Sequence, residues 1–326
     1  MVKIAVLDDW QGVARASADW SALQARAEVT FFADAFPTED AAAAALAEFD
    51  ILLAMRERTR FTGSLLKRLP KLRMLGTTSG RTLSLDLATA TAQRIVCCNT
   101  ESGPGSAATA EIALALLLSA LRGLPVGDAN IRAGRFQQDV PVGHVAEGKV
   151  LGVIGLGRIG ARMARYGRAL GMEVLAWSQN LTAEKAAAEG ARLVPKDELI
   201  ALADAITLHL VLSDRSRGII GAAEIARMKP GAVLVNTSRG PLVDEVALLA
   251  ALHAGRIRAG LDVYDIEPLP ADHPLRHAPN TVMTPHLGYG VAEVWAQFYP
   301  QSIENALAFL DGKPIRVMNP DALAGR

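Results

Sequence analysis

The sequence "VLGVIGLGRIGARMARYGRAL", residues 150–170, places three glycines within six residues, between an apolar run and an Ala/Arg-rich segment. The first five residues predict a buried strand and the last ten a helix, so Gly155, Gly157 and Gly160 occupy a strand-to-helix turn. In such a turn the first glycine permits the tight bend, the second lets the backbone approach a pyrophosphate, and the third lets helix and strand pack closely. Free N–H groups at the helix start favour an anion, so the stretch predicts a dinucleotide-binding site.

Short apolar runs alternate with Ala/Leu-rich helical stretches along the rest of the chain. They are nearly continuously apolar rather than alternating, as expected of parallel strands covered by helices on both faces. The sequence therefore predicts an α/β protein with two doubly wound parallel-sheet domains, one Rossmann-type and one flavodoxin-like. The predicted strands are KIAVLDD, VTFFA, ILLAM, RMLGTT, IVCCN, LGVIG, EVLAWS, LVP, AITLHLV, AVLVNTS, AGLDVYD and TVMTPH.

The length of 326 residues also predicts two domains. Pro104 and Gly105 break the chain before a long apolar helix that begins near Ser106, which places a domain junction near residue 103. A second long helix is predicted at 291–310, and the tail after it is too short to form a core of its own. We therefore expect a discontinuous substrate domain, residues 1–102 and 291–326, and a dinucleotide-binding domain, residues 103–290.

Composition excludes several classes of partner. The 34 basic and 34 acidic residues balance, so neither nucleic acid nor a membrane surface is an expected partner. The expected partner is a small molecule. Asp8 and Asp9 interrupt any secretory signal, and no apolar run approaches the roughly 20 residues of a membrane span. Cys97 and Cys98 are adjacent, which fits neither a redox pair nor a zinc site, so we expect a cytoplasmic protein without a metal.

The strand after the glycine turn bears on the choice of coenzyme. An acidic residue at its end would bond the ribose 2′-hydroxyl of NAD and repel the 2′-phosphate of NADP. Here the strand ends in Ser178 and Gln179, and no arginine follows at once. Arg158 and Lys185 are the cations that could approach a phosphate. The sequence leaves NAD and NADP both open.

Three later strands each end in ionisable groups: Arg239 after one, Asp262 and Glu267 after the next, and His286 after the last. Ligands of open α/β sheets bind outside the carboxyl ends of strands, so these groups should converge. An arginine can bind a carboxylate and a carbonyl oxygen together, and a histidine can donate a proton to that carbonyl. A nearby carboxylate keeps the imidazole protonated. Taken singly, Arg239 could form a surface salt bridge, Glu267 and Asp262 could cap turns, and His286 could be a core histidine. Their joint position at successive strand ends favours reduction of a 2-oxo acid.

With these residues the sequence resembles the D-isomer-specific 2-hydroxyacid dehydrogenases, which include phosphoglycerate dehydrogenase-like enzymes and glyoxylate/hydroxypyruvate reductases. The resemblance implies an NAD(P)-dependent enzyme that interconverts a D-2-hydroxy acid and its 2-oxo acid. Arg239 would bind substrate, His286 would be the acid/base and Glu267 would raise its pKa. A homodimer formed by the cofactor domains is also implied. The matching motifs are TAEIALALLL, GVIGLGRIG, LHLVLSDRSRGII, MKPGAVLVNTSRGPLVDE, GLDVYDIEP and TPHLG.

The same resemblance implies the coenzyme contacts. Gly157, Arg158 and Ile159 would hold the pyrophosphate, and Asp262 would orient the nicotinamide carboxamide. His209 matches a position beside the ribose, and Thr109 matches one near the nicotinamide. The further implied cofactor contacts are Thr237, Ser238 and Gly288.

Departures from the family pattern lie where the substrate tail would bind. "TTSGRTLSLD", residues 77–86, replaces a glycine-rich loop, "MRERT" replaces "RSRT", and Tyr289 replaces a glycine. These changes predict a larger substrate, or a second anionic group near Arg56, Arg58 or Arg81; the alternative is that these arginines are solvated surface groups. The expected substrate-binding residues are Arg56, Ser79, Gly80, Arg81 and Tyr289.

A non-catalytic, dinucleotide-sensing regulator on the same fold is the alternative function. Family members of that kind tend to lose part of the catalytic set, whereas Arg239, Glu267 and His286 are all present here. The sequence therefore favours an enzyme, and leaves its particular 2-hydroxy acid and its pathway open.

Overall fold

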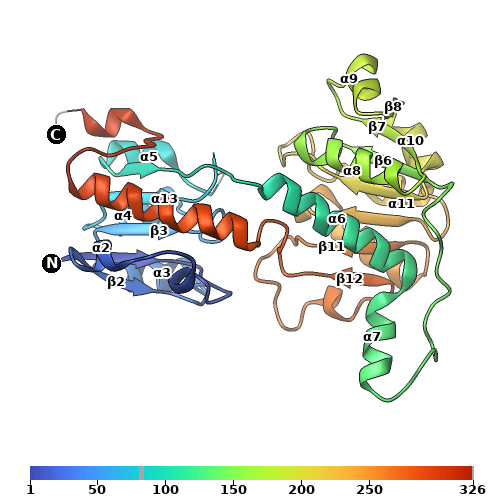
Figure 1. The fold of residues 1–326 in the computed structure, drawn as a ribbon, viewed down its shortest axis with the longest axis horizontal. Helices are drawn as coiled ribbons and strands as arrows, with labels where there is room; N and C mark the ends of the chain where they lie inside the picture. The colour runs from blue at the N-terminus through green and yellow to red at the C-terminus, as the bar shows by residue number, and fades with distance from the viewer. Residues whose placement is uncertain (81–83, 325–326) are drawn as a thin grey trace. The chain divides into compact units, whose positions relative to one another are not determined.

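The computed structural model describes residues 1–80 and 84–324. They divide into two units (Figure 1). Unit 1 consists of Met1–Pro104 together with Val291–Arg326, and unit 2 is the continuous segment Gly105–Gly290. Two segments that are far apart in the sequence thus build unit 1.

Unit 1 contains, in the part of the chain described, a five-stranded parallel sheet in the order β2-β1-β3-β4-β5. This is the strand order of flavodoxin-like sheets. The strands are β1 (Val2–Val6), β2 (Ala27–Phe31), β3 (Ile51–Ala54), β4 (Met74–Thr77) and β5 (Val96–Cys98). The helices are α1 (Ala14–Ser17), α2 (Ser21–Gln24), α3 (Glu39–Leu46), α4 (Gly63–Lys67), α5 (Leu87–Ala92), α13 (Ala292–Leu310) and the 3-10 helix η3 (Pro320–Leu323).

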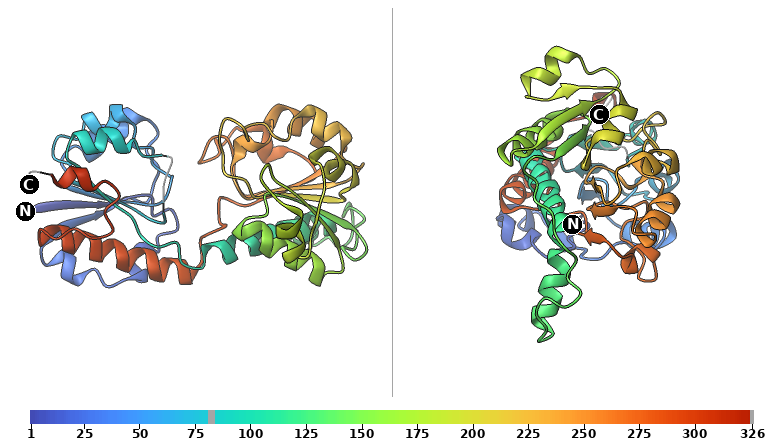
Figure 2. Two further views of the ribbon diagram at one scale, coloured as in Figure 1. Left: turned by 90° about the horizontal axis from the view of Figure 1, so that it is seen from above. Right: turned by 90° about the vertical axis from the view of Figure 1, so that its right-hand side faces the viewer.

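Helices cover both faces of this sheet (Figure 2). α13 packs on β4 together with α1 and α2, while α3, α4 and α5 pack on the other face. The C-terminal segment completes the edge beyond β5, because the Asn319 carboxamide oxygen accepts the Cys97 N–H at 2.8 Å and Cys98 pairs with Val317 in an isolated bridge. Cys97 and Cys98 are fully buried, and burial raises the pKa of both thiols to about 12, so neither is reactive.

Unit 2 contains, over its described length, a seven-stranded parallel sheet in the order β12-β11-β10-β9-β6-β7-β8. Six of these strands reproduce the Rossmann order, and β12 extends it at one edge. The strands are β6 (Val150–Ile154), β7 (Glu173–Trp177), β8 (Arg192–Leu193), β9 (Ala205–Leu208), β10 (Val233–Asn236), β11 (Arg258–Leu261) and β12 (Thr281–Met283).

The helices of unit 2 also form two layers. α6 and α8 cover one face, and α10, α11 and α12 cover the other. The elements are α6 (Gly105–Arg122), α7 (Leu124–Arg132), α8 (Arg158–Ala169), α9 (Ala183–Ala188), α10 (Lys196–Leu202), α11 (Ala222–Arg227), α12 (Glu245–His253) and the 3-10 helices η1 (Gly240–Leu242) and η2 (Pro274–His277). The α/β class with two parallel sheets, predicted from the apolar runs, is confirmed.

α6 is long and apolar enough to cross a membrane by length and composition. In the fold it packs on β10, β11 and β12, with Leu116, Leu117 and Leu121 buried. The packing is close: a Cβ at Gly260 on β11 would lie 2.8 Å from the Cβ of Leu116. The apolar composition of this helix is therefore that of a core helix.

The strand order of unit 2 reverses between β6 and β9, and their carboxyl ends lie side by side. Such a switch point opens a crevice in which doubly wound proteins bind nucleotides. Gly155 follows β6 and His209 follows β9 at this point. The fold thus places the glycine-rich turn where a dinucleotide would bind.

Candidate active site

His286 and Glu267 are hydrogen-bonded to each other beyond the carboxyl ends of the neighbouring strands β12 and β11. The Nδ1 atom of His286 lies 2.6 Å from Oε2 of Glu267, and the two side chains are 21% and 24% exposed. The second carboxylate oxygen of Glu267 accepts the N–H of Tyr264 at 2.8 Å. Because Nδ1 is bonded to the carboxylate, the opposite ring nitrogen, Nε2, is the one that can exchange a proton with a ligand.

The ionisation of Glu267 is set by its neighbours. Burial acts to raise the pKa of this carboxyl, but the hydrogen bond and charge of His286, the N–H of Tyr264 and the Arg239 guanidinium together hold the pKa below its usual range. Glu267 is therefore a carboxylate at neutral pH. This carboxylate fixes the orientation of the imidazole through Nδ1 and leaves Nε2 for a ligand.

A buried carboxylate, Asp262, holds the turn that carries His286. It is fully buried and accepts the Thr284 hydroxyl at 2.5 Å and the N–H groups of Leu287 and Gly288 at 2.7 and 2.8 Å. Burial raises the pKa of Asp262, and these hydrogen bonds oppose that rise. His286 itself has φ +54°, in the left-handed region that non-glycine residues rarely adopt, so the turn depends on such restraints.

Arg239 follows β10, the strand next to β11. Asn236 is buried at the end of that strand; its amide donates to the Arg239 carbonyl at 2.8 Å and its oxygen accepts the Ser238 N–H at 3.1 Å. A Cβ on Gly240 would overlap the backbone of Tyr264, so the turns after β10 and β11 touch. This contact keeps the guanidinium near enough to Glu267 to affect its pKa.

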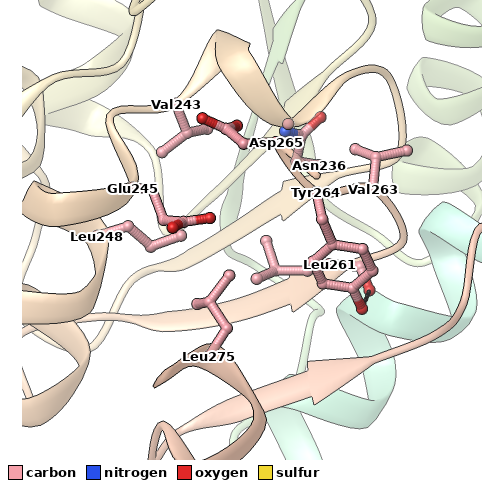
Figure 3. A pocket seen from close by; sticks show the side chains of 10 residues that line it. Asn236, Val243, Glu245, Leu248, Leu261, Val263, Tyr264, Asp265 and Leu275 are labelled. Carbon is pink, nitrogen blue, oxygen red and sulfur yellow. Dashed lines mark hydrogen bonds between the residues drawn. The ribbon is translucent and has the colours of Figure 1, made fainter. Parts of the chain in front are cut away.

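A small cavity lies behind these two turns (Figure 3). Its lining includes Asn236, Leu248, Leu261, Tyr264 and Leu275, with Tyr264 beside Leu261. The cavity is walled by the residues that orient Arg239 and Glu267 rather than by those groups themselves. This cavity is therefore part of the structure that supports the site and is not the substrate pocket.

The glycine-rich turn has the shape of a pyrophosphate cradle. Gly155 has φ +99°, and a Cβ there would lie 2.5 Å from the carbonyl oxygen of His209. A Cβ on Gly160 would overlap the carbonyl oxygen of Gly155, so α8 could not start so close to β6. Gly157 differs: it is exposed, it caps α8, and no atom of the described chain lies within 4 Å of a Cβ there. Arg158 and Ile159 form the first turn of α8.

Two polar atoms of residues that directly follow β9 and β10 are buried without a hydrogen-bond partner among the described residues: Nδ1 of His209 and Oγ1 of Thr237. Nε2 of His209 is bonded to the Thr207 hydroxyl at 2.8 Å, and burial lowers the pKa of the ring to about 3, so it is neutral. Ser238, next to Thr237, is buried and donates to the Leu208 carbonyl at 2.7 Å. Buried unpaired polar atoms are costly, so these two fit contacts to the hydroxyls or phosphates of a dinucleotide.

The other cofactor residues expected from the sequence lie on the same unit. A Cβ on Gly288 would lie 3.0 Å from Oδ2 of Asp262 and 3.2 Å from Cγ2 of Thr109, so these three positions meet. Ser178 and Gln179 directly follow β7, whose last residue, Trp177, accepts the Gly155 N–H at 2.8 Å. Ser178 and Gln179 therefore lie near the switch point, whereas Asp262, Thr109 and Gly288 meet beyond the carboxyl ends of β11 and β12.

The expected substrate residues fall on both units. In unit 1, Arg56 (φ +50°) follows β3 and donates its N–H to the Thr78 hydroxyl at 2.9 Å. Ser79 (φ +70°) and Gly80 follow β4, and the Ser79 N–H donates to the Thr100 hydroxyl at 2.8 Å. Two left-handed non-glycine residues thus stand at the carboxyl ends of neighbouring strands. Arg81 lies outside the described residues.

Arg58 has a structural role in unit 1. Its Nη1 donates to the Asp8 carbonyl at 2.5 Å, and its guanidinium stacks 4.3 Å from the centre of the Trp10 ring. The Asp8 carboxylate accepts the Thr59 hydroxyl at 2.9 Å, and burial raises the pKa of this carboxyl to about 6. The guanidinium is held against these groups, so Arg58 supports the fold of unit 1.

Tyr289 belongs to unit 2 and is buried against His286, with the two rings edge to face at 5.6 Å. It therefore shapes the surroundings of the imidazole. Asn236 was expected among the polar residues at the end of its strand, whereas sequence reasoning missed Tyr264 and Thr284 as site residues. The one signal for Thr284 is position, since it directly follows β12.

A dinucleotide cradle and a histidine–carboxylate pair on one Rossmann-type unit define the class of nicotinamide-coenzyme-binding α/β proteins. Residues 114–288 match the family model described as "D-isomer specific 2-hydroxyacid dehydrogenase, NAD binding domain". The chain belongs to the D-isomer specific 2-hydroxyacid dehydrogenase family.

Relatives agree with this membership. The D-3-phosphoglycerate dehydrogenase of Archaeoglobus fulgidus is 34% identical over 265 residues, 81% of this chain and 50% of the relative. A Ralstonia solanacearum structure, solved as a candidate D-3-phosphoglycerate dehydrogenase oxidoreductase, is 37% identical with a TM-score of 0.92 and covers 99% of this chain and 98% of its own. The phosphoglycerate oxidoreductase of Vibrio cholerae is 35% identical with a TM-score of 0.89, covering 96% and 100%. The chain spans about half the length of the curated relatives it matches.

Proposed function

We propose that this protein is an NAD(P)-dependent oxidoreductase that interconverts a D-2-hydroxy acid and its 2-oxo acid. The observation that carries the proposal is the His286–Glu267 pair, 2.6 Å apart, on the unit that also bears the glycine cradle. A regulator that only senses a dinucleotide has no need of an imidazole poised against a buried carboxylate. Its neighbour Arg239 adds the cation that a 2-oxo acid requires.

Each residue has a role in the reduction. The guanidinium of Arg239 binds the substrate carboxylate and the carbonyl oxygen, which orients and polarises the carbonyl. His286 gives the proton on Nε2 to that oxygen, and Glu267 stabilises the positive ring before the transfer. A bound nicotinamide supplies the hydride to the carbonyl carbon, so the products are the 2-hydroxy acid and the oxidised coenzyme. In the reverse direction Nε2 accepts the hydroxyl proton.

The residues present fit a dinucleotide coenzyme. Gly155, Gly157 and Gly160 form the cradle, and the unpartnered atoms of His209 and Thr237 supply hydrogen-bonding sites beside it. Asp262, Thr109 and Gly288 meet at one point, and we propose that they flank the nicotinamide end. Because Ser178 and Gln179 carry no charge at the end of β7, we propose NAD or NADP as the coenzyme.

The proposed substrate class rests on Arg56 of unit 1. Arg56 stands after β3 in a left-handed conformation, and its N–H donates to the hydroxyl of Thr78, which precedes Ser79 and Gly80. A guanidinium can bind an anionic group, so we propose a 2-oxo acid with a second anionic group, of which the 2-oxo form of D-3-phosphoglycerate is one candidate.

The test is a panel of 2-oxo acids assayed with NADH and with NADPH. It should include glyoxylate, hydroxypyruvate, phenylpyruvate and 3-phosphohydroxypyruvate, with disappearance of the reduced coenzyme as the readout. Turnover of at least one acid, with the D-hydroxy acid as product, supports the proposal. Tight coenzyme binding without turnover of any member would instead favour the regulator.

Glu267→Gln should lower kcat on the order of 10- to 100-fold. The amide can still accept the Tyr264 N–H, but it carries no charge and does not titrate. The acidic limb that protonation of Glu267 gives to the parent profile should therefore be absent from the variant. Rates in both directions over a pH series check this, and equal losses at every pH in both directions would contradict it.

We also propose a homodimer formed through α7 and the segment after it. Several large apolar side chains there are exposed, among them Leu124 (55%), Ile131 (60%), Phe136 (67%) and Val142 (84%). α7 and this segment extend away from the sheet of unit 2 (Figure 1). An exposed apolar surface of this kind is typical of an interface, and a second copy of the chain is the proposed partner.

The double variant Ile131→Asp/Phe136→Asp should therefore be monomeric where the parent is dimeric. Two charges in an apolar interface would be buried without partners. Size-exclusion chromatography with light scattering measures the mass of each. Val246→Asp is the matched control, because Val246 is 79% exposed on α12 of the same unit and should leave the dimer intact. A monomeric parent would contradict the proposed interface.

A further inference from the structure

Tyr264 is hydrogen-bonded to Glu267 and to the turn that carries His286. Its backbone N–H donates to Oε1 of Glu267 at 2.8 Å, and its hydroxyl donates to the carbonyl oxygen of Thr284 at 3.0 Å. That same carbonyl accepts the N–H of His286 at 3.0 Å. One residue therefore touches the carboxylate through its backbone and the histidine turn through its side chain.

The Thr284 carbonyl is the point at which the hydroxyl can act on His286. The bond from the His286 N–H to this carbonyl spans two residues and closes the tight turn in which His286 has φ +54°. A left-handed conformation at a non-glycine residue costs free energy and persists only where neighbours enforce it. A second donor on the carbonyl fixes its direction, and with it the direction in which the imidazole leaves the backbone.

The phenol of Tyr264 is suited to remain such a donor. The side chain is only 8% exposed and lines the cavity beside Leu261 and Leu275 (Figure 3). Burial raises the pKa of the phenol above its ordinary value, so it keeps its proton at any physiological pH. Its hydroxyl has a second, longer contact, at 3.4 Å, to the Leu261 carbonyl.

We propose that Tyr264 is a positioning residue for the proton-transfer step. Its N–H orients the Glu267 carboxylate and its hydroxyl fixes the turn of His286, so that the imidazole stays aligned with the carboxylate. The inference rests on the proposed function, since the alignment matters to catalysis only if His286 exchanges the proton. The competing explanation is that the hydroxyl merely satisfies a buried carbonyl and contributes to stability alone.

Tyr264→Phe separates the two explanations, because it keeps the ring and the N–H and removes only the hydroxyl. We expect kcat to fall roughly tenfold, with KM for the 2-oxo acid and Kd for the coenzyme changed by no more than about twofold. The acidic limb of the pH profile should also move to higher pH. A misaligned imidazole would weaken the hydrogen bond that holds down the pKa of Glu267, so the carboxyl would protonate earlier on acidification.

Tyr166→Phe is the matched control. Tyr166 lies on α8 of the same unit, and in the described part of the chain its hydroxyl makes no hydrogen bond to protein. This variant should retain the parent kcat and pH profile. If Tyr264→Phe lowers the melting temperature but likewise retains both, the hydroxyl has only a structural role and the proposal is overturned.

A readout that needs no substrate keeps this inference distinct from the proposed function. The chain has six histidines, and the imidazole proton signal of His286 can be assigned by its loss in His286→Ala. In the coenzyme-free protein, Tyr264→Phe should shift or broaden that signal and leave the other histidine signals in place. If the parent reduces no 2-oxo acid, the proposed function fails, while an unchanged His286 signal would refute the role of Tyr264.

Discussion

His286→Ala should lose roughly 10²- to 10⁴-fold in kcat for 2-oxo acid reduction, the range expected when a general acid is removed. Nε2 of His286 is the proposed proton donor, and Nδ1 is committed to Glu267 at 2.6 Å. The coenzyme should still bind with a nearly unchanged Kd, because the glycine cradle follows β6 and His286 follows β12, at the edge of the sheet. Steady-state rates and a fluorescence titration with reduced coenzyme measure the two quantities.

His253→Ala serves as the control for this variant. His253 ends α12 and is exposed, so its loss should leave both kcat and Kd unchanged. An unchanged kcat in His286→Ala would remove the central assignment. A parallel loss of coenzyme binding would show that the turn around Asp262, and not the proton, had been disturbed.

Gly157→Ala and Gly160→Ala should separate coenzyme binding from stability. Gly157 has φ −86° and no described atom lies within 4 Å of a Cβ there, so alanine should change the free energy of unfolding of the coenzyme-free chain by no more than about 0.5 kcal/mol. The added methyl would stand where the backbone must approach the pyrophosphate. We expect Kd for the coenzyme to rise on the order of 10- to 100-fold, about 1.4–2.7 kcal/mol.

Gly160→Ala should behave differently, because its Cβ would overlap the Gly155 carbonyl. Forcing a side chain into packed backbone costs about 1–3 kcal/mol, so this variant should be destabilised even without coenzyme. Urea unfolding of the coenzyme-free chains and calorimetric titration of the coenzyme compare the pair. Unimpaired binding by Gly157→Ala would mean that the anion does not approach this turn.

Much of the fold and the site could be predicted because the signals are local. Apolar runs mark parallel strands, and residues that directly follow such strands must lie at one edge of the sheet. Glu267 and His286 are 19 positions apart, yet they follow the paired strands β11 and β12 and were expected to meet for that reason. The glycine spacing is equally local, since each glycine answers one steric demand of a strand-to-helix turn.

The supporting residues could not be predicted in this way. Tyr264 acts through its backbone N–H and its hydroxyl, and nothing in the run GLDVYD indicates which carbonyl that hydroxyl reaches. The position of Tyr289 against His286 depends likewise on side-chain conformations set by the whole unit. The sequence showed that Arg58 was a cation near the expected substrate loop, but not that Trp10 and the Asp8 carbonyl hold it.

The discontinuity of unit 1 has a consequence for synthesis of the chain on the ribosome. β5 has β4 on one side, and on the other its backbone depends on Val317 and Asn319, more than 200 residues downstream. Unit 2 is continuous, so it can fold while the edge of β5 is still bare. During synthesis there should therefore be an interval in which unit 2 has folded while the edge of β5 is still unpaired. Aggregation and chaperone binding are expected in that interval.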